Sequence, residues 1–288
     1  MVGPPGNELN ELSVIRSAGR AIGPLHEPIG TTQQGDWLDV HEEPGQSFED
    51  YRRGAPHRPE TVRKTMCLQP IGEFDAAHAA AVEATAGLLG EFYGAPVRML
   101  ERLDLAWVPY HSRRFHPYTG QEQILTKFVL QLLRRKKPTD AASVMALTTS
   151  DLWPGKGWNF VFGQAARRDG VGVWSLHRLG DPELEPKTFL HRTAKIAVHE
   201  TGHMLGILHC TAHECGMNGS NHLAEADARP MWFCPEDEMK IWWACRVDPA
   251  ERYGRLADVA ARHGLEREAE FWRASRRAVR EKVSDQRI

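Results

Sequence analysis

Hydrophobic residues along the chain recur with two spacings, about two residues and about 3.6 residues, which together predict an α/β (α+β) fold. We expect strands at 66–68, 97–105, 143–149, 158–165 and 171–176. We expect helices at 75–93, from about 121, at 189–206 and at 249–264, with a charged helix after them. The pattern therefore predicts a twisted mixed sheet in the N-terminal part and an irregular-to-helical C-terminal part.

Two of these segments carry features that refine the prediction. The helix expected from about 121 places one apolar face along Ile124, Leu125, Phe128, Val129 and Leu132. The strand at 158–165 is interrupted by Asn159, Gly163 and Gln164, as is typical of an edge or bulged strand. An extended peptide could add to such an edge as another strand, and a plain edge strand is the alternative.

The distribution of Pro, Gly and charge predicts three parts. Residues 1–60 are rich in all three and indicate an irregular arm, which we expect to wrap on the body. Residues 61–247 contain the alternating strands and helices and form the main domain. Residues 248–288 indicate a C-terminal helical hairpin, which begins at Asp248-Pro249.

Composition and charge exclude several classes of partner. The 288 residues are 41% hydrophobic and 26% charged, an ordinary globular balance, and the formal net charge is -2. We therefore expect no nucleic-acid partner, because no strong field attracts one. We also expect no membrane partner, because no run of apolar residues is long enough to cross a bilayer. The first residues have neither a basic nor an apolar region, so no secretory signal is expected.

The cysteines point to metal rather than to disulfides. There are five, an odd number, and four of them follow residue 209, close to histidines. Disulfide frameworks belong mainly to secreted proteins, whereas such a cluster in an intracellular chain is typical of metal ligands. We therefore expect a reducing, cytoplasmic location.

The segment 197–209 contains the residues of a zinc site. His199 and His203 are four positions apart, so both imidazoles project from one face of a helix. Two imidazole nitrogens at that spacing suit adjacent corners of a zinc tetrahedron. Glu200 is placed to act as a general base towards water rather than as a ligand.

A third ligand must come from beyond this helix. Gly206 can adopt the left-handed conformation that ends a helix and turns the chain back, so that His209 can approach the metal. The fourth position would stay open for water or substrate. The constellation predicts a zinc-dependent metallopeptidase that hydrolyses peptide or protein substrates.

His209 is followed by Cys210, Cys215, Met217 and Cys234 at spacings that resemble those of the archaemetzincin family of zinc metallopeptidases, in the metzincin clan. The resemblance runs from about residue 60 to 246, and more weakly into the arm. It implies a metzincin-like zincin fold, with a twisted mixed sheet, backing and active-site helices, and a small irregular or helical C-terminal subdomain. It also implies a catalytic zinc on the three histidines, and a second, structural zinc on four cysteines. By position Met217, rather than Met231, would be the residue of the Met-turn.

The sequence departs from that family at one ligand position, where Asp237 replaces a cysteine. Asp237 could bind zinc through oxygen, since a carboxylate is an acceptable ligand. Cys245 could replace it, although it would lie about 12 Å further along a helix that begins at Pro235. Alternatively, Asp237 could belong to an acidic first helical turn and the second zinc would be weak or absent.

Four further hypotheses concern two histidines, one cysteine, the arm and the chain as a whole. His213 and His222 could contact substrate, but ordinary loop histidines bonded to the backbone are favoured. Cys67 could be an inhibitory thiolate, but a buried strand cysteine is favoured. The arm could cover the active site through its acidic and histidine residues at 36–43. Finally, the chain could be a zinc-binding module with little peptidase activity, an alternative that the intact Glu200 disfavours.

Overall fold

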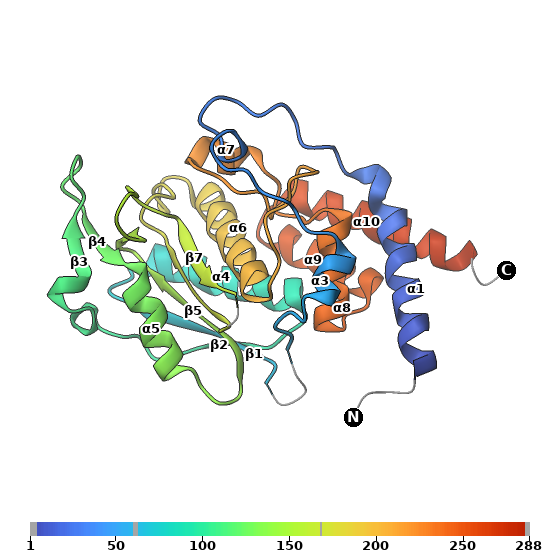
Figure 1. The fold of residues 1–288 in the computed structure, drawn as a ribbon, viewed down its shortest axis with the longest axis horizontal. Helices are drawn as coiled ribbons and strands as arrows, with labels where there is room; N and C mark the ends of the chain where they lie inside the picture. The colour runs from blue at the N-terminus through green and yellow to red at the C-terminus, as the bar shows by residue number, and fades with distance from the viewer. Residues whose placement is uncertain (1–4, 60–62, 168, 286–288) are drawn as a thin grey trace. The chain divides into compact units, whose positions relative to one another are not determined.

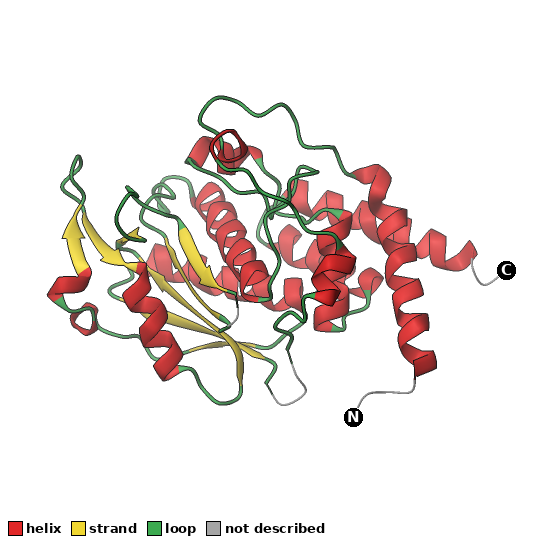
Figure 2. Ribbon diagram, in the orientation of Figure 1, coloured by secondary structure: helices red, strands yellow, loops and turns green. Residues whose placement is uncertain are grey.

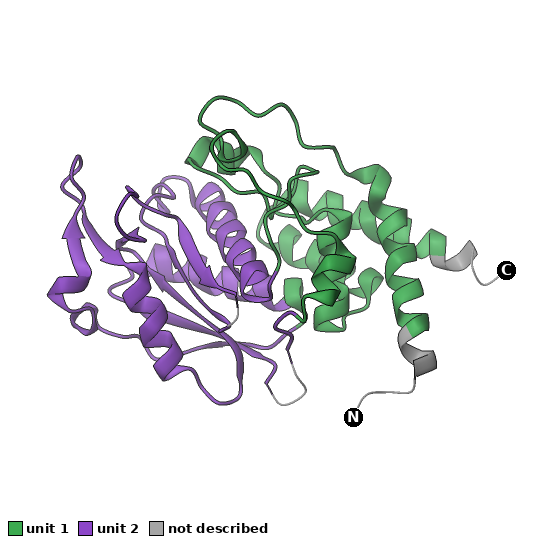
Figure 3. Cartoon of the chain, viewed as in Figure 1, with its two compact units in different colours: residues 1–55, 91–94, 207–288 green, residues 56–90, 95–206 purple. Residues whose placement is uncertain are grey.

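The computed structural model describes residues 5–59, 63–167 and 169–285, and its chain divides into two compact units (Figures 1 and 3). Unit 1 consists of residues 1–55, 91–94 and 207–288, and unit 2 of residues 56–90 and 95–206. These units are made of different residues from the three predicted domains, whose boundaries stay a prediction. Residues 1–4, within the segment for which no secretory signal is expected, lie outside the described residues.

All of the strands are in unit 2 within the described residues (Figure 2). They are β1 (Thr65–Ile71), β2 (Val97–Met99), β3 (Arg113–Phe115), β4 (Glu122–Leu125), β5 (Ala141–Thr148), β6 (Asp151–Trp153), β7 (Gly163–Ala166) and β8 (Val171–Ser175). The main sheet has the order β2-β1-β5-β8-β7 and is parallel except for β7, while β3, β4 and β6 form a second, mixed sheet. The predicted α/β class with a mixed sheet is confirmed.

The helices are α1 (Pro5–Ile22), α2 (Trp37–Val40), α3 (Phe48–Arg53), α4 (Ala76–Tyr93), α5 (Thr126–Lys136), α6 (Pro186–Met204), α7 (Leu223–Ala228), α8 (Pro235–Cys245), α9 (Pro249–Arg262) and α10 (Glu266–Asp285). The predictions of α4, α6 and α9 are confirmed to within three residues. Helices α9 and α10 pack against each other in the region where a helical hairpin is predicted. No described helix is long and apolar enough to span a membrane.

Burial on both faces explains why the centre of the main sheet could be predicted. Every residue of β5 is buried, as expected of a parallel strand covered on both sides. Val171 and Val173 of β8 share one hydrophobic core with Val129 and Leu133 of α5. Gly172 points to the other face, where a Cβ atom would lie 3.3 Å from the sulfur of Met204 in α6. The sheet therefore lies between α5 and the helix that carries the histidines.

The helix expected from about 121 begins later than predicted. Residues Glu122–Leu125 form β4 instead, paired with β3 and β6. The side chain of Gln123 is fully buried and donates to Asp151 at 2.8 Å, a partner that the local pattern does not reveal. Ile124 and Leu125 therefore belong to a strand and not to the apolar face of α5.

Two predicted strands are shorter than expected. In 158–165 only the end is a strand, because the backbone carbonyl of Asn159 accepts hydrogen bonds from Arg114 and Gln123 instead of from another strand. In 97–105 only β2 is regular, and the backbone N–H of Leu103 makes a separate bond to Pro70 further along β1. The prediction that 158–165 reaches the sheet edge is confirmed, since β7 is an edge strand.

The arm at residues 1–60 is not wholly irregular, which corrects the prediction. Helix α1 occupies 18 of these residues and buries Leu12, Ile15, Ala18 and Ile22. These positions follow a helical spacing, and α1 packs against α8 and α10 within unit 1. Helix α3 begins with a capping box between Ser47 and Asp50. The segment between α1 and α3 is largely irregular, as expected.

A candidate metal and catalytic site

Helix α6 presents His199 and His203 on one face. It begins with Pro186 in its first turn and ends at Met204, just before Gly206 turns the chain at φ +90°. The two imidazole rings meet edge to face, with centroids 4.6 Å apart. Both side chains are half-buried.

Glu200 lies beside these histidines in an unusual environment. The residue is 7% exposed, and its Oε2 atom has no hydrogen-bond partner among the described residues. Burial raises the pKa of this carboxyl group to about 8. Gly163, the first residue of β7, lies against it, since a Cβ atom there would be 2.6 Å from Oε1. Unit 2 thus places a basic carboxylate next to the edge strand of its sheet.

His209 lies six residues after His203 in the same continuous segment. Along this segment, one ring nitrogen of each of the three histidines lies within 4.8 Å of the others. The predicted turn at Gly206 is confirmed by its positive φ and by the bond from its N–H to the carbonyl of His203. The three residues predicted as ligands of the catalytic zinc are therefore neighbours in one continuous segment, with His199 and His203 on α6 and His209 after the turn at Gly206.

Within unit 1, His209 contacts two residues of the arm. Its Nδ1 atom lies 2.9 Å from both carboxylate oxygens of Glu43. Burial raises the pKa of Glu43, but the hydrogen bond and charge of His209 outweigh this, so the pKa is lowered overall. Trp37 packs edge-on against the imidazole at a centroid distance of 5.0 Å.

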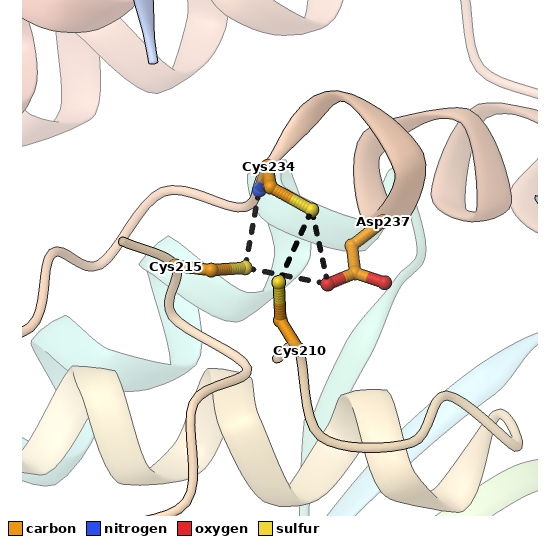
Figure 4. A group of neighbouring side chains, drawn as sticks. All are labelled: Cys210, Cys215, Cys234 and Asp237. Atoms are coloured by element: carbon orange, nitrogen blue, oxygen red, sulfur yellow. Dashed lines mark hydrogen bonds between the residues drawn. The ribbon is translucent and has the colours of Figure 1, made fainter. Parts of the chain in front are cut away.

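A second group of possible ligands is formed by Cys210, Cys215, Cys234 and Asp237, all buried and in unit 1 (Figure 4). The sulfurs of Cys210 and Cys234 are 3.6 Å apart. Oδ2 of Asp237 lies 3.3 Å from the sulfur of Cys215 and 3.4 Å from that of Cys234. The sulfur of Cys215 also accepts bonds from the backbone N–H groups of Met217 and Cys234.

The ionisation of this cluster is uneven. Hydrogen bonds from the neighbouring thiols lower the pKa of Cys210 strongly. Burial raises the pKa of Cys215, and the bond to Cys210 raises that of Cys234. Cys210 is therefore the most acidic of the three thiols, and a bound metal would release the protons that the cluster still holds.

Asp237 is held in the cluster by a buried cation. Nζ of Lys240, one turn further along α8, donates to its Oδ1 at 2.6 Å, and both side chains are almost fully buried. Burial nevertheless raises the pKa of Asp237. Cys245 is at the far end of α8 and is not in the group, so the structure brings Asp237 and not Cys245 to the cysteines.

Met217, His213 and His222 each take part in a hydrogen bond or bridge that stabilises a loop. Met217 is fully buried, and its carbonyl accepts from the N–H of Cys210, which ties the chain after Cys215 back to the ligand segment. His222 caps α7 by accepting from the backbone of Glu225. His213 forms a backbone bridge to Pro28 of the arm.

A third group of possible ligands, Asp36, His222 and Glu225, fastens the arm. Nε2 of His222 lies 3.3 Å from Asp36, and the oxygens of Glu225 accept from the backbone N–H groups of Trp37 and Asn221. These oxygens already have protein donors, so the group fastens the arm to the rest of unit 1.

Cys67 lies in β1 and is 1% exposed, and burial raises the pKa of its thiol. The favoured interpretation, a buried strand cysteine, is confirmed. Sequence reasoning gave no role in the site to Lys240, and named Glu43 and Gly163 only as parts of the acidic arm segment and of the edge strand. Of these only Lys240 carried a local signal, since it lies three residues after Asp237 on the same helix face.

Comparison with known proteins relates the chain to zinc peptidases. The model of peptidase family M54 matches residues 123–242. Human archaemetzincin-2 is 33% identical over 282 residues, which cover 85% of this chain and 78% of that protein. The archaemetzincin of Archaeoglobus fulgidus is 33% identical over 160 residues, covering 56% of this chain and 90% of that protein.

Solved structures give the same relation. The crystal structure of archaemetzincin from Archaeoglobus fulgidus complexed with malonate is 28% identical and superposes with a TM-score of 0.50, covering 61% of this chain and 99% of that one. The crystal structure of archaemetzincin from Methanopyrus kandleri is 29% identical and superposes with a TM-score of 0.53. The match covers 66% of this chain and 99% of that one. The predicted fold, a zincin with a mixed sheet and an active-site helix, is thereby confirmed.

Proposed function

The chain belongs to peptidase family M54, the archaemetzincins, and is a zinc metallopeptidase; from this premise we propose which residues bind its zinc and how they act on a peptide bond. The observation that carries the proposal is the buried carboxyl group of Glu200, whose Oε2 atom has no hydrogen-bond partner in the described part of the chain, beside the group His199, His203 and His209. Family membership favours this peptidase over the alternative of an inactive zinc-binding module.

His199, His203 and His209 would hold the catalytic zinc. Three imidazole nitrogens with a neighbouring carboxylate that is not a ligand are the usual donor set of catalytic zinc, which leaves a position for water or substrate. When bound, zinc would polarise the scissile carbonyl and lower the pKa of water. The residues present fit the ion, because imidazole nitrogens are ordinary zinc ligands and the three side chains are half-buried.

Glu200 would act as general base and then as general acid. Burial raises the pKa of this carboxyl group in the metal-free protein, and a carboxylate placed beside bound zinc can accept a proton from water. The same proton can then pass to the amine that leaves. A buried carboxyl group with a raised pKa can perform both transfers near neutral pH.

The edge strand β7 would orient the substrate. Its one partner in the main sheet is β8, so a peptide can pair along its other edge as an additional strand. Gly163 at its start has no side chain between this edge and Glu200. An extended peptide bound there would pass next to the carboxylate.

A second zinc would bind to Cys210, Cys215, Cys234 and Asp237. Zinc–ligand bonds of about 2.3 Å to sulfur and 2.0 Å to oxygen give tetrahedron edges of about 3.8 Å between sulfurs and 3.5 Å between sulfur and oxygen. The distances of 3.6, 3.3 and 3.4 Å are close to these edges. Four buried ligands leave no open position, so this zinc would be structural.

The charge of this second site also suits zinc. Three thiolates, a carboxylate and one Zn²⁺ sum to two negative charges, and Lys240 reduces the sum to one.

The five cysteines are free thiols, which favours a reducing compartment, and we place the protein in the cytoplasm on this ground.

The test of the proposed function is cleavage of a diverse peptide library, read by mass spectrometry, by the zinc-loaded protein and by Glu200→Gln. We expect wild-type cleavage to fall at least about 1,000-fold in the variant, since general-base catalysis contributes factors of this order. Zinc content should remain the same, because Glu200 is not a ligand. Equal cleavage by both proteins would refute the role of Glu200, and no cleavage by either would support the binding module.

A further inference from the structure

Glu43 contacts His209, one of the three ligands in the proposed zinc site, and the role inferred for Glu43 rests on that proposal. We propose that Glu43 is the positioning carboxylate of His209, so that the N-terminal arm is a functional part of the catalytic metal centre. In the sequence, Glu43 lies well before residues 123–242, the part of the chain that matches the family model.

The geometry assigns the two ring nitrogens of His209 to different tasks. Both oxygens of Glu43 lie 2.9 Å from Nδ1, and a carboxylate can only accept. Nδ1 therefore carries the ring proton, and this N–H donates a hydrogen bond to Glu43. In a neutral imidazole the lone pair is then on Nε2, which is the form that binds a metal.

Burial gives this hydrogen bond strength. The side chain of His209 is 14% exposed and that of Glu43 is 25% exposed, so solvent competes weakly for either group. A carboxylate that receives the second N–H of a ligand histidine fixes the ring orientation and raises the basicity of the ligand nitrogen. The edge contact of Trp37 restrains the same ring.

Glu43 is held in place by the residues that follow it. The side-chain oxygen of Gln46 accepts from the backbone N–H of Leu208, the residue before His209. The backbone carbonyl of Gln46 accepts from Nζ of Lys240 at 2.6 Å. Gly45 lies so close to Thr211 that a Cβ atom would be 2.6 Å from its hydroxyl oxygen.

These bonds connect the two proposed metal sites. Lys240 donates both to Gln46 and to Asp237, which is in the cysteine group. The segment 43–46 therefore contacts the third histidine at one end and the cation that supports the cysteine group at the other. Such double anchoring is expected of a segment that must hold a ligand in a fixed orientation.

The experiment compares metal affinity at each site in the full-length protein. Co²⁺ is the probe, since thiolate charge-transfer absorption reports the cysteine site and ligand-field absorption reports the histidine site. Affinities come from competition with a chelator of known strength. The variants are Glu43→Ala and Glu43→Gln, with Glu42→Ala as the matched control because Glu42 is the exposed neighbour.

We expect Glu43→Ala to weaken Co²⁺ at the histidine site 10- to 100-fold, the usual effect of removing such a partner. Glu43→Gln keeps a neutral acceptor and should lose about 3- to 10-fold. Both variants should keep the cysteine-site affinity within twofold, as should Glu42→Ala at both sites. Peptide cleavage at saturating zinc gives a second readout.

The proposal is overturned if Glu43→Ala binds the probe at the histidine site within twofold of Glu42→Ala. It is also overturned if both sites weaken together, because the contact would then only support the fold. Should Glu43→Ala not fold, Glu43→Gln decides, and a loss below twofold refutes the proposal. A wild type that takes no metal at the histidines would instead refute the proposed function.

Discussion

Gly163 and Glu200 show how one missing side chain can decide the chemistry of the site. A methyl group at position 163 would lie 2.6 Å from Oε1 of Glu200, closer than atoms can approach. We predict that Gly163→Ala displaces the carboxylate and lowers kcat at least 10-fold, since small misplacements of catalytic groups are costly. Steady-state kinetics test this, with zinc content as a check on the ligands.

The matched control is Gly87→Ala. Gly87 lies in α4, and a Cβ atom there meets nothing within 4 Å. This variant should keep full activity and gain about 0.5–1 kcal/mol of stability from the helix. Gly163→Ala with wild-type kinetics would show that Glu200 has room to move and need not occupy its present position.

The raised pKa of Glu200 also predicts a pH dependence of stability in the zinc-free protein. Burial raises this pKa from 4.5 to about 8, so the folded state holds the proton more tightly than the unfolded state does. Between these pH values the unfolded state has released the proton, and the free energy of unfolding therefore falls as pH rises. The loss from pH 4.5 to 8 should be about 3–5 kcal/mol.

Urea unfolding of zinc-free wild type and Glu200→Gln at several pH values measures this effect. The glutamine variant lacks the titrating group, so its advantage over wild type should grow from pH 5 to pH 8. His199 and His203 are present in both proteins and cancel in the comparison. A constant difference across this range would mean that the carboxyl group ionises normally in the folded state.

At the scale of elements, helix α8 combines an ion pair with a metal ligand. Lys240 and Asp237 are both almost completely buried, and removal of one partner from such a pair costs about 3–5 kcal/mol. We predict this loss in the free energy of unfolding for Lys240→Met without zinc. Bound zinc supplies another positive charge, so the loss should be smaller in the loaded protein.

The double variant Asp237→Cys with Lys240→Met is the internal control. It restores the four-cysteine set of the family and removes the unpaired carboxylate, so zinc-loaded stability should recover to within about 1 kcal/mol of wild type. Urea unfolding with and without zinc measures both variants. Equal stability of Lys240→Met and wild type without zinc would show that Asp237 is protonated and needs no cation.

The elements that could be predicted are those whose pattern is local. Strand β5 is mostly apolar and is buried along its full length, and α6 combines the histidine spacing with a glycine just after its end. The pattern failed at β4, where the buried polar Gln123 depends on Asp151, 28 residues away. It failed also at α1, whose buried face stands in a segment rich in Pro and Gly.

The same distinction applies to the candidate site. His199, Glu200 and His203 lie within one helical turn and a half, and their spacing alone predicts zinc chemistry. Glu43 lies 166 residues before His209, and Gly163 is far from Glu200 in sequence. Such partners are chosen by tertiary packing, which a single sequence does not show.

At the scale of the whole molecule, zinc should contribute to stability through unit 1. The cysteine group joins the segment after His209 to the start of α8. Without a metal ion, its three thiols and one carboxyl group are buried close together. A ligand at 100 times its dissociation constant stabilises the folded state by about 2.7 kcal/mol. We therefore predict that removal of zinc lowers Tm by about 5–10 °C, at about 2–4 °C per kcal/mol.

Scanning calorimetry with excess zinc and with a chelator tests this prediction, and two variants assign the effect to a site. His209→Ala removes a proposed ligand of the catalytic zinc only, so most of the shift in Tm should remain. Cys215→Ser removes a buried ligand of the second group, so most of the shift should disappear. The reverse result would mean that the stabilising zinc is the catalytic one and that Asp237 has made the cysteine group a weak site.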